Sequence, residues 1–284
     1  MRKTTRLLAL TVLLLFSFTA IAAGKGNVIR ILAIGNSFSE DAVEQYLYEL
    51  ARESGYELVI GNAYRGGQGF ESHWKDVSTF ADTFEYRKVV GGKKTNRPKS
   101  SLRSIIEDEP WDYITFQQVS QDSGRPETYE PFLTYLINYV RLYAANKDVK
   151  LGFHMTWAYA KDSTHGGFAN YGRDQMKMYD SIVAATKGAL KRHPELVFVI
   201  PSGTAIQDAR TSRLGDTLNR DGYHLDYNIG RYTAACTWYE AILGKNAVRN
   251  AYCPPSVSAE DAVIARKAAH YAVRKPFRIH TIKN

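Results

Sequence analysis

The chain has 284 residues, of which 44% are hydrophobic and 23% charged, and its formal net charge is +8. This length and apolar content are enough for one domain with a sizeable core. The positive surplus includes a cluster at Lys93, Lys94, Arg97 and Lys99. The basic and aromatic motifs of nucleic-acid-binding proteins are not present, so we expect a solvated surface and no nucleic-acid partner.

The N-terminal segment has the pattern of a secretory signal peptide. Three cations at positions 2, 3 and 6 precede an apolar run over residues 7–21, and Ala20-Ile21-Ala22 supplies small residues for cleavage. The run is shorter than the roughly 20 residues of a spanning helix, which disfavours an uncleaved anchor. We therefore expect a signal peptide over residues 1–22, a single domain over residues 23–284, and a soluble periplasmic or extracellular protein.

Strand-like and helix-like patterns then alternate along the chain. Strands are predicted at residues 28–34, 57–63, 113–117, 150–156 and 196–200. Helices are predicted at residues 42–51, 100–107, 131–145, 171–192, 229–243 and 259–273. Residues 84–90, followed by Gly91-Gly92, indicate a hairpin or an irregular insertion. This alternation predicts an α/β protein, a three-layer α/β/α sandwich around a five-stranded parallel sheet.

Ligands bind such sheets at the carboxyl ends of the strands. Several candidate residues lie at or just after those ends: Ser37, Gly66-Gly67, Gln117-Gln118 and His154. The topology is therefore expected to bring them to one edge of the sheet.

Ser37 follows a buried strand and a tight turn, where its hydroxyl would be exposed as a nucleophile. The alternative is a structural N-cap for the next helix, although Ser39 suits that role better. Asp221-Gly222-Tyr223-His224 supplies a histidine to take the Ser37 proton and an acid to orient it. The alternative for this pair is an Asx-turn and a histidine bonded to the backbone.

An oxyanion hole needs N–H donors aimed at the reacting carbonyl oxygen. The Ser37 backbone and a glycine at position 66 or 67 are candidates. A side-chain amide at position 117 or 118 would add a third donor, but strand alternation points those two side chains to opposite faces.

Three further residues, His73, His154 and Trp157, are weaker candidates for the wall of a substrate pocket, and each has an equally plausible structural role. No nucleotide-binding glycine motif is present, and the histidines do not have zinc-ligand spacing, so we expect neither a cofactor nor a metal. Whether Cys236 and Cys253 pair is left open by the sequence, as is the oligomeric state.

These blocks resemble the SGNH/GDSL hydrolase superfamily, and specifically a poorly characterised secreted bacterial subgroup. Ile34-Gly35-Asn36-Ser37-Phe38-Ser39 is similar to its serine block, with Asn36 where the usual motif has Asp. Gly66-Gly67 is similar to the glycine block and Asp221-Gly222-Tyr223-His224 to the last block. Phe116-Gln117-Gln118-Val119-Ser120 stands where the family has Gly-x-Asn. The subgroup resemblance is carried by residues 154–159 and 201–207.

The resemblance implies a flavodoxin-like sheet and ester hydrolysis without a cofactor. It implies Ser37, His224 and Asp221 as the triad, and Ser37, Gly67 and Gln118 as the oxyanion hole, with Gly66, Gln117 and Ser120 as alternatives. The expected substrate is an O-acyl ester, above all an O-acetyl group on a carbohydrate. The ester substrate can be a small molecule or a polysaccharide. The alternatives are a lipase or thioesterase and a non-catalytic glycan-binding protein on the same fold.

Overall fold

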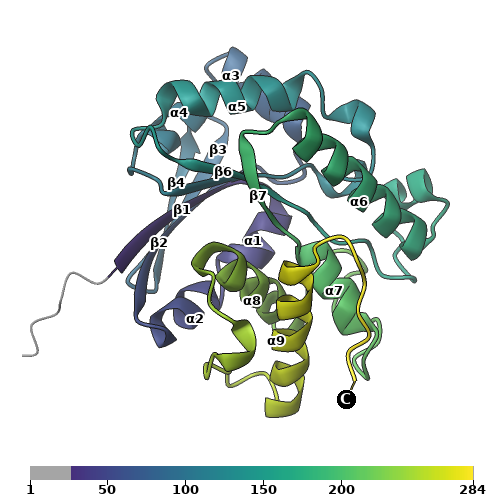
Figure 1. Cartoon of the computed structure of the whole chain (residues 1–284). Helices are drawn as coiled ribbons and strands as arrows, with labels where there is room; N and C mark the ends of the chain where they lie inside the picture. The colour runs from purple at the N-terminus through teal and green to yellow at the C-terminus, as the bar shows by residue number, and fades with distance from the viewer. Residues whose placement is uncertain (1–26, 284) are drawn as a thin grey trace, which may run out of the picture.

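The computed structural model describes residues 27–283, so the predicted signal peptide lies outside the described residues (Figure 1). Within residues 27–283, no helix combines the length and the apolar character needed to cross a membrane.

In residues 27–283 the strands form one mixed sheet, in the order β4-β3-β2-β1-β5-β6-β7. Its five parallel strands are β1 (Asn27–Gly35), β2 (Tyr56–Tyr64), β5 (Tyr113–Phe116), β6 (Lys150–His154) and β7 (Leu196–Ile200). Counted among themselves, these strands have the order 2-1-3-4-5 of flavodoxin-like sheets, which places a topological switch point beside β1.

The sheet has seven strands, so the prediction of five is wrong. The hairpin of β3 (Phe84–Val90) and β4 (Lys93–Ser100) extends the β2 edge in antiparallel fashion. β4 has no apolar residue and is exposed along nearly its whole length, so hydrophobic alternation cannot reveal it. The basic cluster lies on this edge strand, where lysine and proline discourage pairing with another chain.

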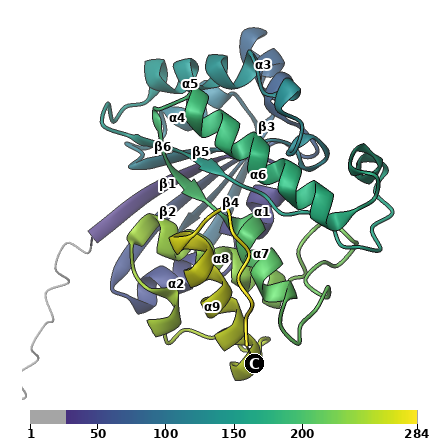
Figure 2. The ribbon, with the colours of Figure 1, turned by 45° about the vertical axis from the view of Figure 1, so that its right-hand side comes forward.

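Helices cover both faces of the sheet (Figures 1 and 2). One face carries α1 (Ser37–Val43), α2 (Leu47–Glu53), α7 (Ser202–Arg210), α8 (Ile229–Leu243) and α9 (Ala259–Arg274). On the other side lie α3 (Phe70–Ser78), α4 (Leu102–Ile106), α5 (Phe132–Tyr143) and α6 (Gln175–Arg192). Short 3-10 helices occupy Ser120–Asp122, Pro126–Thr128, Gly166–Tyr171 and Ala247–Arg249. Alternate residues of β1 enter the two cores: Ile31 packs on one side and Leu32 on the other.

The helical predictions need two corrections. The stretch 42–51 is divided between α1 and α2, because Tyr46 has φ +70° and its hydroxyl donates to the Tyr227 carbonyl at 2.8 Å. In addition, α3 and α7 were not predicted. Cys236 and Cys253 are both free thiols in the structure.

His73 on α3 is fully buried against Phe84, with 5.4 Å between the ring centroids. Among the described residues, neither of its ring nitrogens has a hydrogen-bond partner. Burial lowers the pKa of His73 to about 4. The unfolded chain therefore takes up this proton at a higher pH than the folded chain does.

This difference predicts that His73 destabilises the fold as the pH falls from about 6.5 towards 4. At pH 5.0 the free energy of unfolding should be about 2 kcal/mol lower on this account than at pH 7.5. Urea unfolding at the two pH values measures the difference, and His73→Leu should reduce it. An equal pH dependence in the wild type and in His73→Leu would contradict this assignment.

Candidate functional site

Ser37 is the first residue of α1, directly after the turn that leaves β1. Asn36 is the N-cap of this helix, since its side-chain oxygen accepts the Phe38 N–H at 3.0 Å. Ser39, which the sequence favoured as the cap, instead donates to the Asn36 carbonyl at 2.7 Å. Neither serine caps the helix, and the Ser37 hydroxyl is left for other contacts.

The turn before Ser37 is tight because Gly35 allows close approach of its neighbours. A Cβ at position 35 would lie 2.7 Å from the Ser39 hydroxyl oxygen and 2.8 Å from the Gln117 side chain. A larger residue would push either side chain away and shift the start of α1.

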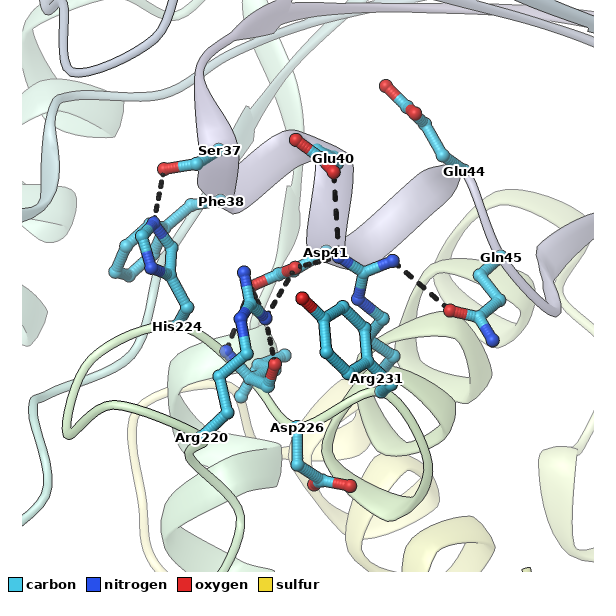
Figure 3. Close-up of polar contacts among 12 residues, drawn as sticks. Ser37, Phe38, Glu40, Asp41, Glu44, Gln45, Arg220, His224, Asp226 and Arg231 are labelled. Carbon is cyan, nitrogen blue, oxygen red and sulfur yellow. Dashed lines mark hydrogen bonds and ion pairs between the residues drawn. The ribbon is translucent and has the colours of Figure 1, made fainter. Parts of the chain in front are cut away.

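The Ser37 hydroxyl meets His224 across the sheet edge (Figure 3). His224 Nε2 lies 2.8 Å from Ser37 Oγ, and His224 Nδ1 lies 2.7 Å from Asp221 Oδ2. Since the carboxylate can only accept, Nδ1 carries a proton and Nε2 is free to accept the serine proton. The structure thus brings Ser37, His224 and Asp221 into one hydrogen-bonded chain.

Asp221 is held in its charged form by its own loop. Burial raises the pKa of the Asp221 carboxyl, but hydrogen bonds from His224 and from two backbone N–H groups together bring it below its usual value. The N–H groups belong to Tyr223, at 3.1 Å, and His224, at 2.7 Å. The sequence offered an Asx-turn at Asp221 as the alternative to a catalytic role. In the structure, Asp221 makes the backbone contacts of such a turn and also contacts the His224 imidazole.

A cavity of about 320 Å³ opens over Ser37 and His224. Most of the residues in its wall are polar or aromatic, and Val119 is the one aliphatic residue among them. The wall consists of Asn36, Ser37, Tyr64, Gly66, Gly67, Val119, Ser120, Gln121, His165, Tyr223 and His224. Such a wall suits a small polar ligand better than a long hydrocarbon chain.

The glycine pair lies in a turn beside the nucleophile. The Gln68 N–H donates to the Arg65 carbonyl at 3.1 Å, and Gly67 has φ +67°. The Asn36 side chain donates to the Gln68 carbonyl at 2.9 Å, which ties this turn to the start of α1. Both glycines line the cavity.

Gln118 is engaged elsewhere and does not line the cavity. Its side-chain nitrogen donates to Thr128, to the carbonyl at 3.0 Å and the hydroxyl at 3.1 Å. Its oxygen accepts the N–H groups of Phe70 and Val119. The geometry therefore gives no support to Gln118 as an oxyanion donor, because its amide joins the end of β5 to the start of α3.

Gln117 belongs to a series of buried, hydrogen-bonded side chains that ends at Asn36, in the turn before Ser37. Its nitrogen donates to Asn36 Oδ1 at 2.8 Å, and its oxygen accepts from His154 Nδ1 at 2.8 Å. His154 Nε2 is 2.9 Å from the Ser202 hydroxyl. Burial lowers the pKa of His154 to about 3, so this histidine is neutral and acts as a structural link.

Ser120, the other alternative from the third block, does line the cavity. Its hydroxyl oxygen lies 2.7 Å from the Tyr159 hydroxyl, and either oxygen can be the donor. The Ser120 hydroxyl also donates to the Gln121 side-chain oxygen, at the long distance of 3.4 Å. If Tyr159 donates to Ser120, a group in the cavity competes only with this long contact for the Ser120 proton.

The three weaker candidates all lie outside the cavity wall. His73 and His154 are buried as described above. Trp157 is fully buried, stacks on Phe38 with ring centroids 4.3 Å apart, and donates to the Tyr223 carbonyl at 2.7 Å. Trp157 therefore supports the loop of His224 from behind.

Sequence reasoning missed Tyr64, Gln121, His165 and Tyr223 as wall residues. Tyr64 ends β2, so the strand-end rule could have found it. His165 lies in the long connection between β6 and α6, and its Nδ1 accepts the Gly167 N–H at 3.0 Å. Burial, and then His224, lower the pKa of His165, which favours a neutral ring whose Nε2 carries the proton.

Within residues 27–283, no group of three or more His, Cys, Asp or Glu side chains has a geometry that could hold a metal ion.

The sequence and the structure of this chain were compared with those of known proteins. No curated protein sequence matches the chain. The crystal structure of a DUF4886 family protein from Bacteroides uniformis is similar, with 46% identity and a TM-score of 0.87 over 90% of this chain and 98% of that one.

A candidate SGNH hydrolase from Slackia heliotrinireducens shares the fold, with 16% identity and a TM-score of 0.50 over 76% of this chain and 100% of that one. The resemblance to the SGNH hydrolases is thereby confirmed at the level of the fold. The model of a domain of unknown function, DUF4886, matches residues 30–272. The chain therefore belongs to the DUF4886 family.

Proposed function

We propose that the protein is an SGNH-type serine esterase that hydrolyses O-acyl esters, with short acyl groups on carbohydrates as the preferred substrates. The observation that carries this proposal is the hydrogen-bonded chain from Ser37 through His224 to Asp221, which opens into a polar cavity. A serine, a neutral imidazole and a carboxylate in this order are the elements of nucleophilic acyl transfer.

In the proposed reaction, Ser37 Oγ attacks the ester carbonyl while His224 Nε2 takes the serine proton. Asp221 holds the ring in the required tautomer and stabilises the imidazolium. The tetrahedral intermediate collapses, and His224 returns the proton to the departing alcohol. Water then attacks the acyl-enzyme, with His224 again as the base, and releases the carboxylic acid and free Ser37.

The negative charge on the intermediate needs donors that are already in place. The Ser37 N–H lies in the first turn of α1, where amides lack an intrahelical acceptor. Gly67 lies in the neighbouring turn and has no side chain to block its backbone. We assign the third donor to the Ser120 hydroxyl, because it lines the cavity and its bond to Gln121 is long at 3.4 Å, whereas the Gln118 amide donates to Thr128 at 3.0 Å.

The cavity supports a short acyl group on a polar alcohol. Val119 is its one aliphatic wall residue, so a long acyl chain would lie against polar groups. Tyr64, Tyr223 and His165 offer flat rings and polar tips that suit a sugar. An exported protein cleaved after residue 22 would meet such esters outside the cytoplasm.

The rival function is a glycan-binding protein without catalysis, since a fold alone does not establish activity. The same cavity would serve it. What disfavours it is the pairing of His224 with both Ser37 and Asp221, which sugar binding does not require.

The proposal predicts ester hydrolysis that depends on Ser37 and falls with acyl length. The wild type should release acid from 4-nitrophenyl acetate faster than from the octanoate, and acetate from acetylated polysaccharides. Ser37→Ala and His224→Ala should each lower kcat on the order of 10³-fold or more. Asp221→Asn should also lower kcat, because the amide favours the wrong imidazole tautomer.

His270→Gln is a matched control, since His270 pairs with Glu240 at 2.7 Å and does not line the cavity. It should retain activity. Full activity in Ser37→Ala would show that Ser37 is not the nucleophile. If the wild type released no acid from any of these esters and yet was retained on a glycan column, the rival function would be favoured.

The oxyanion assignment predicts different outcomes at two positions of the third block. Ser120→Ala should lower kcat by about 10²-fold, the usual effect of losing one such donor. Gln118→Met should chiefly lower the melting temperature, because it removes hydrogen bonds to Thr128, Phe70 and Val119. Steady-state kinetics and thermal unfolding of both variants test this. A loss of kcat in Gln118→Met alone would restore the assignment made from the sequence.

A further inference from the structure

The loop that carries Asp221 and His224 has little regular structure of its own. Residues 211–228 connect α7 to α8 without a helix, and one isolated bridge pairs Asn219 with Leu225. The Asp221 side chain is 39% exposed. Contacts with the rest of the fold must therefore hold this loop at hydrogen-bond distance from Ser37.

Trp157 and the Ala160 N–H contact the carbonyls of Tyr223 and Gly222 in the middle of this segment, and Asp41 makes further contacts from the helix that carries the nucleophile. It lies one turn after Ser37 on α1, and its side chain is fully buried. Its carboxylate accepts from Arg220 Nη1, at 3.1 and 3.2 Å, and from the Leu225 N–H, at 2.8 Å. Arg220 comes directly before Asp221, and Leu225 directly after His224. One carboxylate thus binds both ends of the segment that carries the acid and the base.

Arg220 also closes the loop on itself. Its Nη1 donates to the Leu225 carbonyl, and its backbone N–H donates to the His224 carbonyl at 3.0 Å. The guanidinium therefore joins the loop's two ends to each other and to α1.

A second arginine reaches the same carboxylate from outside the loop. Arg231 on α8 lies 2.6 Å from Asp41 Oδ1 and donates to Gln45 at 3.1 Å. Both guanidinium groups lie over the Tyr227 ring, each at 4.7 Å from its centroid. Figure 3 shows the two arginines converging on Asp41 beside Ser37 and His224. Burial raises the pKa of the Asp41 carboxyl, and the two arginines oppose that rise.

We propose that Asp41 is a positioning residue for catalysis: it sets the distance between Ser37 and His224 through its contacts with Arg220 and Leu225. Arg231 completes the charge balance of the buried carboxylate, and its guanidinium contacts the loop at Tyr227, outside the segment 220–225 that Asp41 binds. This proposal rests on the esterase function proposed above. It does not give Asp41 or Arg220 a contact with substrate, since neither lines the cavity.

The two arginines provide a matched comparison, because both bind the same carboxylate and only one belongs to the loop. Arg220→Met should lower kcat for 4-nitrophenyl acetate by about 10- to 100-fold, since small displacements of reacting groups have effects of this size. KM should change less than kcat, because Tyr223 and His224 are the only wall residues that belong to residues 219–225. Arg231→Met should have a clearly smaller effect on kcat, and Arg220→Lys should recover part of the loss.

Hydrogen–deuterium exchange provides a readout that does not depend on turnover. Arg220→Met and Asp41→Asn should raise exchange in residues 219–225 more than Arg231→Met does. Melting temperatures of all variants show how far each fold is weakened. Equal losses of kcat in the two Met variants at similar melting temperatures, or full activity in Arg220→Met, would overturn the proposal.

The two proposals can also fail separately. If the wild type hydrolysed no ester, the esterase function would fail, and the exchange data would still decide whether Asp41 holds the loop. Unchanged exchange in residues 219–225 of both Arg220→Met and Asp41→Asn would overturn the positioning role. If ester hydrolysis depended on Ser37 and the Arg220 variants were fully active, only the positioning role would fall.

Discussion

The hydrogen bond between Ser37 and His224 joins two segments that are 187 residues apart in the chain. At 2.8 Å it tolerates little displacement of either partner, so the order of the sheet, the turn after β1 and the loop before α8 must all be set correctly. β1 lies between β2 and β5, at the switch point of the parallel strands. The carboxyl end of β1 therefore faces the loops that build the cavity, and Ser37 is the residue that this end presents.

Two separate sets of polar contacts hold the partners of that bond. The first set is a series of hydrogen-bonded side chains, Ser202–His154–Gln117–Asn36, which runs from the start of α7 to the N-cap of α1. All four side chains are buried, so each depends on its neighbour to satisfy its hydrogen-bonding groups. The second set is made by Asp41, which binds Arg220 and Leu225 on either side of the segment that carries Asp221 and His224. The first set fixes where the nucleophile turn begins, and the second fixes where the base approaches it.

The sequence identified the parallel strands and the blocks at their ends, because buried strands are apolar and catalytic residues follow them closely. It could not identify β4, whose side chains are polar and exposed, or α7, a short helix of nine residues in which polar side chains such as Ser202, Gln207 and Asp208 are buried. Gln117 and Gln118 both looked like donors because their amides suit that role. Their actual contacts, to Asn36 and Thr128, depend on turns whose geometry no local pattern reveals. The same is true of His165, which reaches the cavity from a long connection.

The most direct test of the account is covalent labelling of Ser37 by a fluorophosphonate, because this reagent reacts with a serine that a neighbouring base activates. Intact mass and peptide mapping should show one phosphonyl group, on the peptide that contains Ser37. The adduct should be absent from Ser37→Ala and formed far more slowly in His224→Ala. Labelling of another residue, or labelling of Ser37 at the wild-type rate without His224, would contradict the central claim that these two side chains act together.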